Sequence, residues 1–423
     1  MDSLVKKSFR ILFGRASVSV LSILFTIYFA YELPKKIFAL IVIYETAAAL
    51  FMVFTDLGLS AKVTKEAPPL LRDKKQHEAI RSVIFPSTLL RMLSCVLFCL
   101  LLFTIAVFFN DALKKEFTTL DINHIIFMGC LGILFEGLST ATEPVFAVNQ
   151  KFGANSFLDA GANLVEQIFA LMLYLPFGMN HYFTGVFFAQ FFIFLIRCFM
   201  IRDTLRQFDF RFLSFQLYKN ILLNYFPFYL RRFFRMGFLQ GEQLLVAALL
   251  PLEQLANFNL AKKTSKYLKR YIDAFAHPFI VKLSKTRDLG IRSEFMITFL
   301  KFTIPPPLIL CVLSPWIMPL IGGDKYAGSW PILAIFYFSY VFYALSTMQL
   351  CVITIFGDNK DSLYADVTAG IIGFAATFFL ILSLGETGLA WGQVISFLTL
   401  YLAGRIMSRR FKADPKDAQV DSH

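Results

Sequence analysis

A group of basic side chains interrupts an apolar stretch in the second half of the chain. Residues 256–280 carry five cations and an acid at helical spacing, namely Lys262, Lys263, Lys266, Lys269, Arg270 and Asp273. At about 100° per residue, all six fall within an arc of about 120° on a helix whose opposite face is apolar. One aspartate cannot neutralise five cations, so this face needs either water or an anionic ligand.

The same spacing has a second interpretation. A basic amphipathic helix that lies flat on a membrane surface would also place its cations on one side. The two interpretations differ in whether the segment crosses the membrane, and the sequence favours a crossing because the distribution of loop charges then stays consistent.

Other cations lie inside apolar segments and could line the same cavity. Charged side chains within a membrane are costly and usually face water or a ligand, and Arg and Lys are natural binders of phosphate and carboxylate groups. The sequence therefore predicts a cationic substrate-binding cavity lined by Arg15, Arg91, Arg235, Lys262, Lys263, Lys266, Lys269 and Arg270.

Several acids also lie within or at the ends of apolar segments. Such carboxylates can bind H⁺ or Na⁺, or can form static ion pairs with arginines. The candidates for a coupling-ion role are Glu45, Glu143, Asp159, Glu166 and Glu242.

Motifs of soluble enzymes are absent from the sequence. It contains no Walker A loop and no GxSxG or HExxH motif, and its six cysteines show no CxxC or Cys/His metal spacing. We therefore expect no catalytic residues, no metal, no cofactor and no ATP hydrolysis by this chain.

The composition indicates that the candidate residues lie on membrane helices. Of 423 residues, 57% are hydrophobic and only 17% are charged, which excludes a soluble globular protein. We expect an all-α polytopic membrane protein in which Pro305, Pro306 and Pro307 interrupt one helix. Twelve segments are long and apolar enough to be predicted as membrane helices: 10–31, 37–58, 83–109, 122–147, 157–178, 181–201, 221–250, 256–280, 295–319, 329–352, 362–383 and 387–407.

The loop charges predict an orientation and a domain layout. With the N-terminus in the cytoplasm, most loop lysines and arginines fall on the cytoplasmic side, so both termini should be cytoplasmic. This bias accounts for most of the net charge of +12 without a nucleic-acid partner. The predicted parts are a six-helix lobe at 1–201, an amphipathic cytoplasmic linker at 202–220, a second six-helix lobe at 221–407 and a cytoplasmic tail at 408–423.

Short motifs along the whole chain resemble one transporter family. They are the turn Thr55–Ser60, the passage AVNQKFGANSFLDAGANLVEQ, the stretch GEQLLVAALLPLEQLANFNLA, the link MPLIGGDKYAGSWPILAIF and the segment GETGLAWGQVISFLTL. In order and spacing, these resemble the Wzx-type O-antigen and capsular polysaccharide flippases of the MOP (multidrug/oligosaccharidyl-lipid/polysaccharide) exporter superfamily.

The resemblance implies a fold and a function. The fold would be two six-helix lobes around a central cavity in a bacterial inner membrane. The substrate would be an undecaprenyl-pyrophosphate-linked oligosaccharide moved from the cytoplasmic to the periplasmic leaflet. Transport would be coupled to an H⁺ or Na⁺ gradient or to the membrane potential rather than to ATP. Partners would be membrane lipids, a polysaccharide polymerase and a chain-length regulator. A MATE-like cation or drug antiporter and a lipid II-type flippase are the alternatives, and the basic face argues against a cationic substrate.

The orientation can be tested with reporter fusions. If twelve helices cross the membrane, a reporter placed after Ser422 and one placed within residues 202–220 should both report a cytoplasmic location. A reporter near Gly323 should report a periplasmic one, because an odd number of crossings separates it from the N-terminus. A periplasmic signal from the fusion within 202–220 would contradict the layout of six plus six helices.

Overall fold

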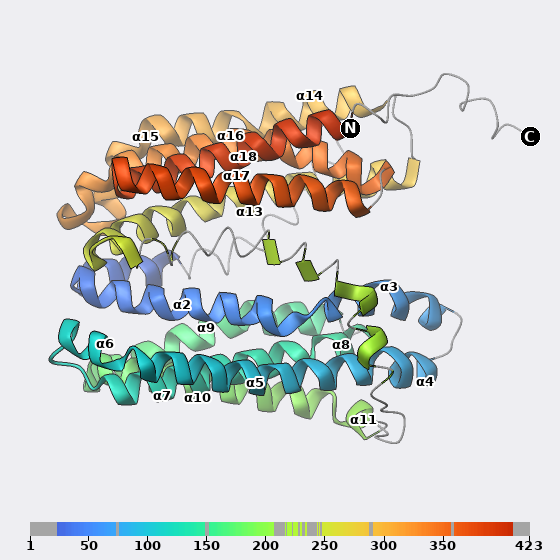
Figure 1. The fold of residues 1–423 in the computed structure, drawn as a ribbon, viewed down its shortest axis with the longest axis horizontal. Helices are drawn as coiled ribbons and strands as arrows, with labels where there is room; N and C mark the ends of the chain where they lie inside the picture. The colour runs from blue at the N-terminus through green and yellow to red at the C-terminus, as the bar shows by residue number, and fades with distance from the viewer. Residues whose placement is uncertain are drawn as a thin grey trace, which may run out of the picture. The chain divides into compact units, whose positions relative to one another are not determined.

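The computed structural model of the chain is helical throughout the part that it describes, apart from short turns, and that part contains no strand (Figure 1). The described residues are 23–72, 76–148, 152–206, 216, 218–221, 223–226, 229–230, 233–234, 243, 245, 248–286, 291–356 and 359–408.

The chain divides into two compact units. Unit 1 combines residues 1–43 with residues 238–423, and unit 2 comprises residues 44–237. The division falls inside one helix, α2 (Lys35–Asp56), so each unit contains part of it. The lobe and linker boundaries expected from the sequence stay a prediction.

Unit 2 is an antiparallel bundle of helices. Helix α10 packs along both α7 and α9, and α5 packs along α7. A buried apolar cluster that includes Val63, Val83, Val145, Phe146 and Ile201 joins the short helices at one end of the bundle. Its described helices are the second part of α2, α3 (Leu59–Arg72), α4 (Gln76–Ala79), the π-helix η1 (Ile80–Ile84), α5 (Phe85–Phe108), α6 (Asn110–Glu116), α7 (Ile122–Ala141), α8 (Glu143–Val148), α9 (Phe152–Phe177), α10 (Met179–Met200) and α11 (Arg202–Leu205).

Unit 1 is built around α16. This helix packs against α13, α15 and α18, and α18 in turn packs along α17. The described helices are Ile23–Glu32, the first part of α2, α13 (Leu252–Thr286), α14 (Ile291–Thr303), α15 (Pro305–Gly322), the 3₁₀ helix η3 (Asp324–Ser329), α16 (Trp330–Phe356), α17 (Asn359–Leu384) and α18 (Glu386–Ser408).

Two parts of unit 1 that are far apart in the sequence are joined by polar contacts. The Tyr31 hydroxyl donates to the carbonyl oxygens of Pro319 and Leu320, each at 3.1 Å. The Lys325 ammonium donates to the carbonyl oxygens of Tyr31 at 2.8 Å and Leu33 at 2.7 Å. These bonds hold the turn before α2 against the end of α15 and the start of η3.

Eight described helices are long and apolar enough to cross a membrane, so the chain is a multi-pass membrane protein. Each overlaps one of the twelve predicted segments. They are Lys35–Asp56, His77–Phe108, Ile122–Phe146, Met179–Met200, Met296–Gly322, Asp324–Ile353, Leu363–Leu384 and Glu386–Ser408.

The remaining four predicted segments leave the count of twelve unconfirmed. Two overlap the shorter apolar helices Ile23–Glu32 and Gly161–Phe177. The segment 221–250 lies mostly outside the described residues. The segment 256–280 lies in α13, which is long enough to cross a membrane but carries too many charges to qualify by composition.

Helix α13 is packed into unit 1 rather than laid on its surface. Leu255, Phe258 and Ile272 are buried, and the Phe258 ring contacts that of Phe336 on α16 at 5.2 Å between centroids. The Tyr271 hydroxyl donates to the Phe302 carbonyl on α14 at 2.9 Å. These contacts favour the interpretation of this segment as a helix of the bundle over that of a surface helix.

The predicted proline break is confirmed. Helix α14 ends at Thr303 and α15 begins at Pro305, with Ile304 between them. A proline in the first turn of a helix loses no hydrogen bond, so three consecutive prolines can begin α15 although they could not lie inside a continuous helix.

Close helix packing in unit 2 depends on Gly185 of α10. A Cβ atom at this position would meet the Phe169 carbonyl oxygen and lie 2.7 Å from the Ala170 Cα on α9. Both are backbone atoms and cannot turn aside, so α9 and α10 approach this closely only because residue 185 has no side chain.

We predict that Gly185→Ala pushes α9 and α10 apart. Overpacking of this kind costs about 1–3 kcal/mol, so the purified variant should unfold at a lower temperature than the unchanged protein. Gly161→Ala is the matched control, because a Cβ there has no neighbour within 4 Å, and alanine favours the helix. Equal unfolding temperatures for the two variants would contradict the packing argument.

Candidate functional site

The five cations of the predicted stripe lie on one continuous helix, α13. Lys266 and Arg270 are exposed, whereas Lys262, Lys263 and Lys269 are half-buried. Because α13 is helical across all five positions, the cations share one face, as the spacing predicts. The exposed pair is one helical turn apart and is the part of the stripe best placed to meet a ligand.

Lys269 has local partners that offset its charge. Its ammonium lies 3.5 Å from a carboxylate oxygen of Asp273 and 5.2 Å from the ring centroid of Tyr343 on α16. The Tyr343 hydroxyl donates to the other Asp273 oxygen at 2.6 Å. These contacts tie α13 to α16, so Lys269 and Asp273 fix the helix that carries Lys266 and Arg270.

Aromatic rings lie under three more cations of the stripe. Lys262 lies 5.5 Å from the Phe258 centroid and Lys263 lies 5.6 Å from the Phe38 centroid. The Arg270 guanidinium lies 5.4 Å from the Tyr267 centroid. Cation–π contacts of this kind stabilise a charge without neutralising it, so the stripe keeps its positive character.

Unit 2 contains a group of three acids that interact with one another or with neighbouring polar side chains. Glu166 on α9 accepts a hydrogen bond of 2.6 Å from the Gln190 amide on α10. Glu136 on α7 interacts electrostatically with the exposed Glu45 on α2. Tyr182 on α10 interacts with both Glu45 and Glu166. The structure thus brings together two of the predicted coupling acids, Glu45 and Glu166, and adds Glu136.

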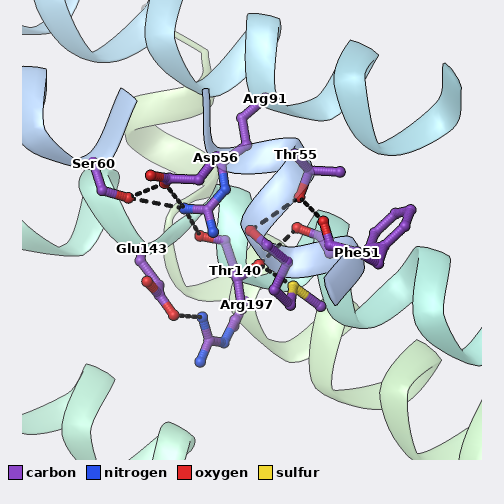
Figure 2. A network of polar contacts seen from close by, with 10 residues as sticks. Phe51, Thr55, Asp56, Ser60, Arg91, Thr140, Glu143 and Arg197 are labelled. Carbon is purple, nitrogen blue, oxygen red and sulfur yellow. Dashed lines mark hydrogen bonds and ion pairs between the residues drawn. The ribbon is translucent and has the colours of Figure 1, made fainter. Parts of the chain in front are cut away.

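Arg91 on α5 lies in a buried network rather than on an open face. Its side chain is 5% exposed, and its Nη1 atom lies 3.7 Å from an Asp56 carboxylate oxygen. The same atom donates to the Thr140 carbonyl at 3.3 Å and to the Ser60 hydroxyl at 3.5 Å, and Ser60 donates to Asp56. Figure 2 shows the guanidinium surrounded by these groups, which join α2, α3, α5 and α7.

Glu143 on α8, which is half-exposed, forms a second ion pair with a buried arginine. A carboxylate oxygen lies 3.8 Å from Nη1 of Arg197 on α10, and that nitrogen also donates to the Ser139 carbonyl at 3.1 Å (Figure 2). The pair ties the end of α7 and the start of α8 to α10. Breaking a buried ion pair leaves an uncompensated charge, so both pairs stabilise this end of unit 2.

A cation of the loop after α2 is also buried in unit 2. Lys62 on α3 donates to the Ser82 carbonyl at 3.4 Å and lies 3.8 Å from a Glu66 carboxylate oxygen. Burial lowers the pKa of Lys62, and the charge of Glu66 partly opposes this shift. Helix α3 is therefore packed against the bundle at Lys62.

Four predicted site residues lie outside what the structure describes. They are Arg15, Arg235 and Glu242, and the side chain of Asp159, whose backbone is part of α9.

The sequence-based candidates omitted the partners of these charges. Asp56, Arg197 and Tyr343 are separated by tens of residues from Arg91, Glu143 and Asp273, so no local spacing reveals the pairing. One available signal was the position of Asp56 in the Thr55–Ser60 turn, which is among the motifs that carry the family resemblance.

Comparison with solved structures shows which fold this is. An inward closed conformation of the lipid II flippase MurJ matches with a TM-score of 0.73 at 14% identity, over 95% of this chain and 87% of that one. An inward-facing multidrug resistance MATE family transporter of the MOP superfamily matches with a TM-score of 0.67 at 13% identity, over 95% of this chain and 100% of that one. A point mutant of the Vibrio cholerae MATE transporter VcmN matches with a TM-score of 0.60 at 14% identity, over 97% of each chain.

These likenesses show the fold of MOP transporters at low sequence identity. No curated protein matches the sequence. A family model described as polysaccharide biosynthesis protein matches residues 4–284, which is about two thirds of the chain. The chain therefore belongs to the polysaccharide biosynthesis protein family.

Proposed function

We propose that the protein is a flippase, not an enzyme, and that it moves an undecaprenyl-pyrophosphate-linked oligosaccharide of an O-antigen or capsule across the bacterial inner membrane. The observation that carries the proposal is the exposed pair Lys266 and Arg270 on α13, in a chain of the polysaccharide biosynthesis family. A lipid-linked pyrophosphate is anionic, and this pair offers it charge-assisted hydrogen bonds.

The polar surroundings of the stripe fit a substrate with both charge and hydroxyl groups. Lys262, Lys263 and Arg270 stand beside aromatic rings, and Tyr343 lies next to Lys269. Cations and rings side by side on α13 and its neighbours can hold a phosphate group and an adjoining sugar. A net positive face also offsets the cost of moving the headgroup away from water.

The positive charge of this face distinguishes the proposed flippase from a MATE-like antiporter of cations. A MATE-like antiporter of cations would need acidic or aromatic groups where its substrate binds, and five cations on one face would repel such a substrate. A lipid II-type flippase shares the anionic lipid carrier, and only the sugar part of the substrate would distinguish it.

Transport needs an energy source, and the acids of unit 2 are the candidates for it. Glu136 interacts electrostatically with the exposed Glu45, and Glu166 accepts a hydrogen bond from Gln190. Two carboxylates that repel each other favour binding of a proton or Na⁺ between them. We propose that this binding drives alternating access to the two sides of the membrane, with both termini cytoplasmic and with a polymerase and a chain-length regulator acting on the product.

Charge reversal on the stripe tests substrate binding. Lys266→Glu and Arg270→Glu should lower surface polysaccharide per amount of inserted protein, because losing one charge-assisted contact weakens binding by about ten- to a hundredfold. Lys266→Arg should retain most of the output, since it keeps the positive charge.

Two controls separate binding from folding. Lys301→Glu reverses an exposed cation on α14, which is not the helix that carries the stripe, and should leave the output unchanged. Leu268→Ala empties a buried position and should reduce the amount of protein rather than the output per molecule. If both stripe reversals insert normally and give full output, the stripe is not the substrate path.

Neutralising the acids of unit 2 tests coupling. Glu45→Gln, Glu136→Gln and Glu166→Gln keep the side-chain shape and remove the charge that would bind the ion. Transport in membrane vesicles should then lose its dependence on an imposed H⁺ or Na⁺ gradient.

The exposed Glu116 on α6 provides the charge-matched control, and Glu116→Gln should transport as before. Glu143→Gln should act differently, by lowering the unfolding temperature through loss of the pair with Arg197. Unchanged gradient dependence in all three acid variants would refute the assignment of coupling to this cluster.

A further inference from the structure

Asn259 on α13 is a buried amide whose two polar atoms are both unpaired. The residue is 1% exposed, and neither Oδ1 nor Nδ2 has a hydrogen-bond partner among the described residues. An unpaired donor and acceptor in an apolar interior are costly, and native proteins keep few of them without a reason. A leucine of similar volume would avoid this cost, so the amide calls for an explanation.

The position of Asn259 connects it to the basic stripe. It precedes Lys262 by three residues and Lys263 by four, and so lies on the same face of α13, one turn and about 5 Å further along the axis. Lys266 follows one turn after Lys262. The stripe of cations therefore ends in a neutral amide.

Because the Asn259 amide has both a donor and an acceptor to satisfy, it restricts which chemical groups of a ligand could bind there. A bound cation would satisfy Oδ1 and leave the NH₂ group unpaired. A phosphate group at neutral pH would satisfy the NH₂ group and leave Oδ1 unpaired. A hydroxyl group both donates and accepts, so adjacent hydroxyls of a sugar satisfy both amide atoms at once.

We propose that Asn259 reads the sugar that is attached to the pyrophosphate, while the lysines that follow it hold the phosphate groups. This inference rests on the proposed function and deepens it, because it separates recognition of the carrier from recognition of the glycan. The pyrophosphate lies along the cations from Lys262 to Arg270, and the first sugar lies one helical turn before Lys262, at Asn259. Asn259 is then a residue that determines which glycan is accepted.

Binding to two probes tests this division. The full chain in lipid nanodiscs is measured with undecaprenyl pyrophosphate and with the lipid-linked oligosaccharide extracted from cells that lack this protein. Asn259→Leu should weaken binding of the sugar-bearing probe by about tenfold and leave binding of undecaprenyl pyrophosphate unchanged, because it removes the hydrogen bonds to the sugar alone. Lys266→Glu should weaken binding of both probes.

The unfolding temperature gives a second, independent readout. If the amide has no partner within the protein, Asn259→Leu should unfold at the same temperature as the unchanged chain or at a higher one. Asn257→Leu is the matched control two residues away. It removes an amide that donates to Glu386 at 3.2 Å, so it should lower the unfolding temperature and leave the preference between the two probes unchanged.

Each outcome bears on one claim. If Asn259→Leu keeps the preference for the sugar-bearing probe, the amide serves a bound water only and the inference is overturned. If Asn259→Leu lowers the unfolding temperature as much as Asn257→Leu, the amide is structural and the inference is again overturned. If Lys266→Glu and Arg270→Glu bind both probes normally, it is the proposed function that fails.

Discussion

The cost of placing charge in apolar surroundings governs the structure of both units. Each buried arginine of the network in unit 2 has a carboxylate and a backbone carbonyl within reach, as Arg91 has Asp56 and Thr140. On α13, Lys269 has Asp273 and a tyrosine ring. The carboxylates and carbonyls that pair with these cations also hold together the helices that carry them. Lys266 and Arg270 are exposed on the helix that these contacts hold in place.

Unit 2 contains a group of interacting acids, and unit 1 presents a row of cations on α13. The described part of unit 2 gathers Glu45, Glu136 and Glu166 among its helices, whereas unit 1 presents a cationic face on α13. The proposed function assigns the anionic substrate to the cations of α13 and the coupling cation to these acids. Each of the two would then bind to side chains of one compact unit.

The sequence predicted local features well and long-range partners poorly. Helix length and apolar content depend on consecutive residues, so eight predicted segments overlap candidate spans and the break at Pro305 was correctly placed. The shared face of the cations on α13 follows from helical periodicity alone. The partners of Arg91 and Glu143 depend on which helices meet, and no pattern within one segment contains that information. Residues such as Asn259 escaped notice because being unpaired is a property of the folded chain.

The hydrogen bonds of Lys325 and Tyr31 have a consequence for biosynthesis. They join residues almost three hundred positions apart, so the segment that carries Tyr31 is synthesised long before its partners exist. Unit 2 is one continuous stretch of chain and can complete its packing as soon as it has been synthesised. Unit 1 combines the first part of the chain with the last, so its first segment lacks those bonds until the later part has been made. Unit 1 is therefore the first unit to begin and the last to be completed. It stays incomplete during most of the synthesis of each chain.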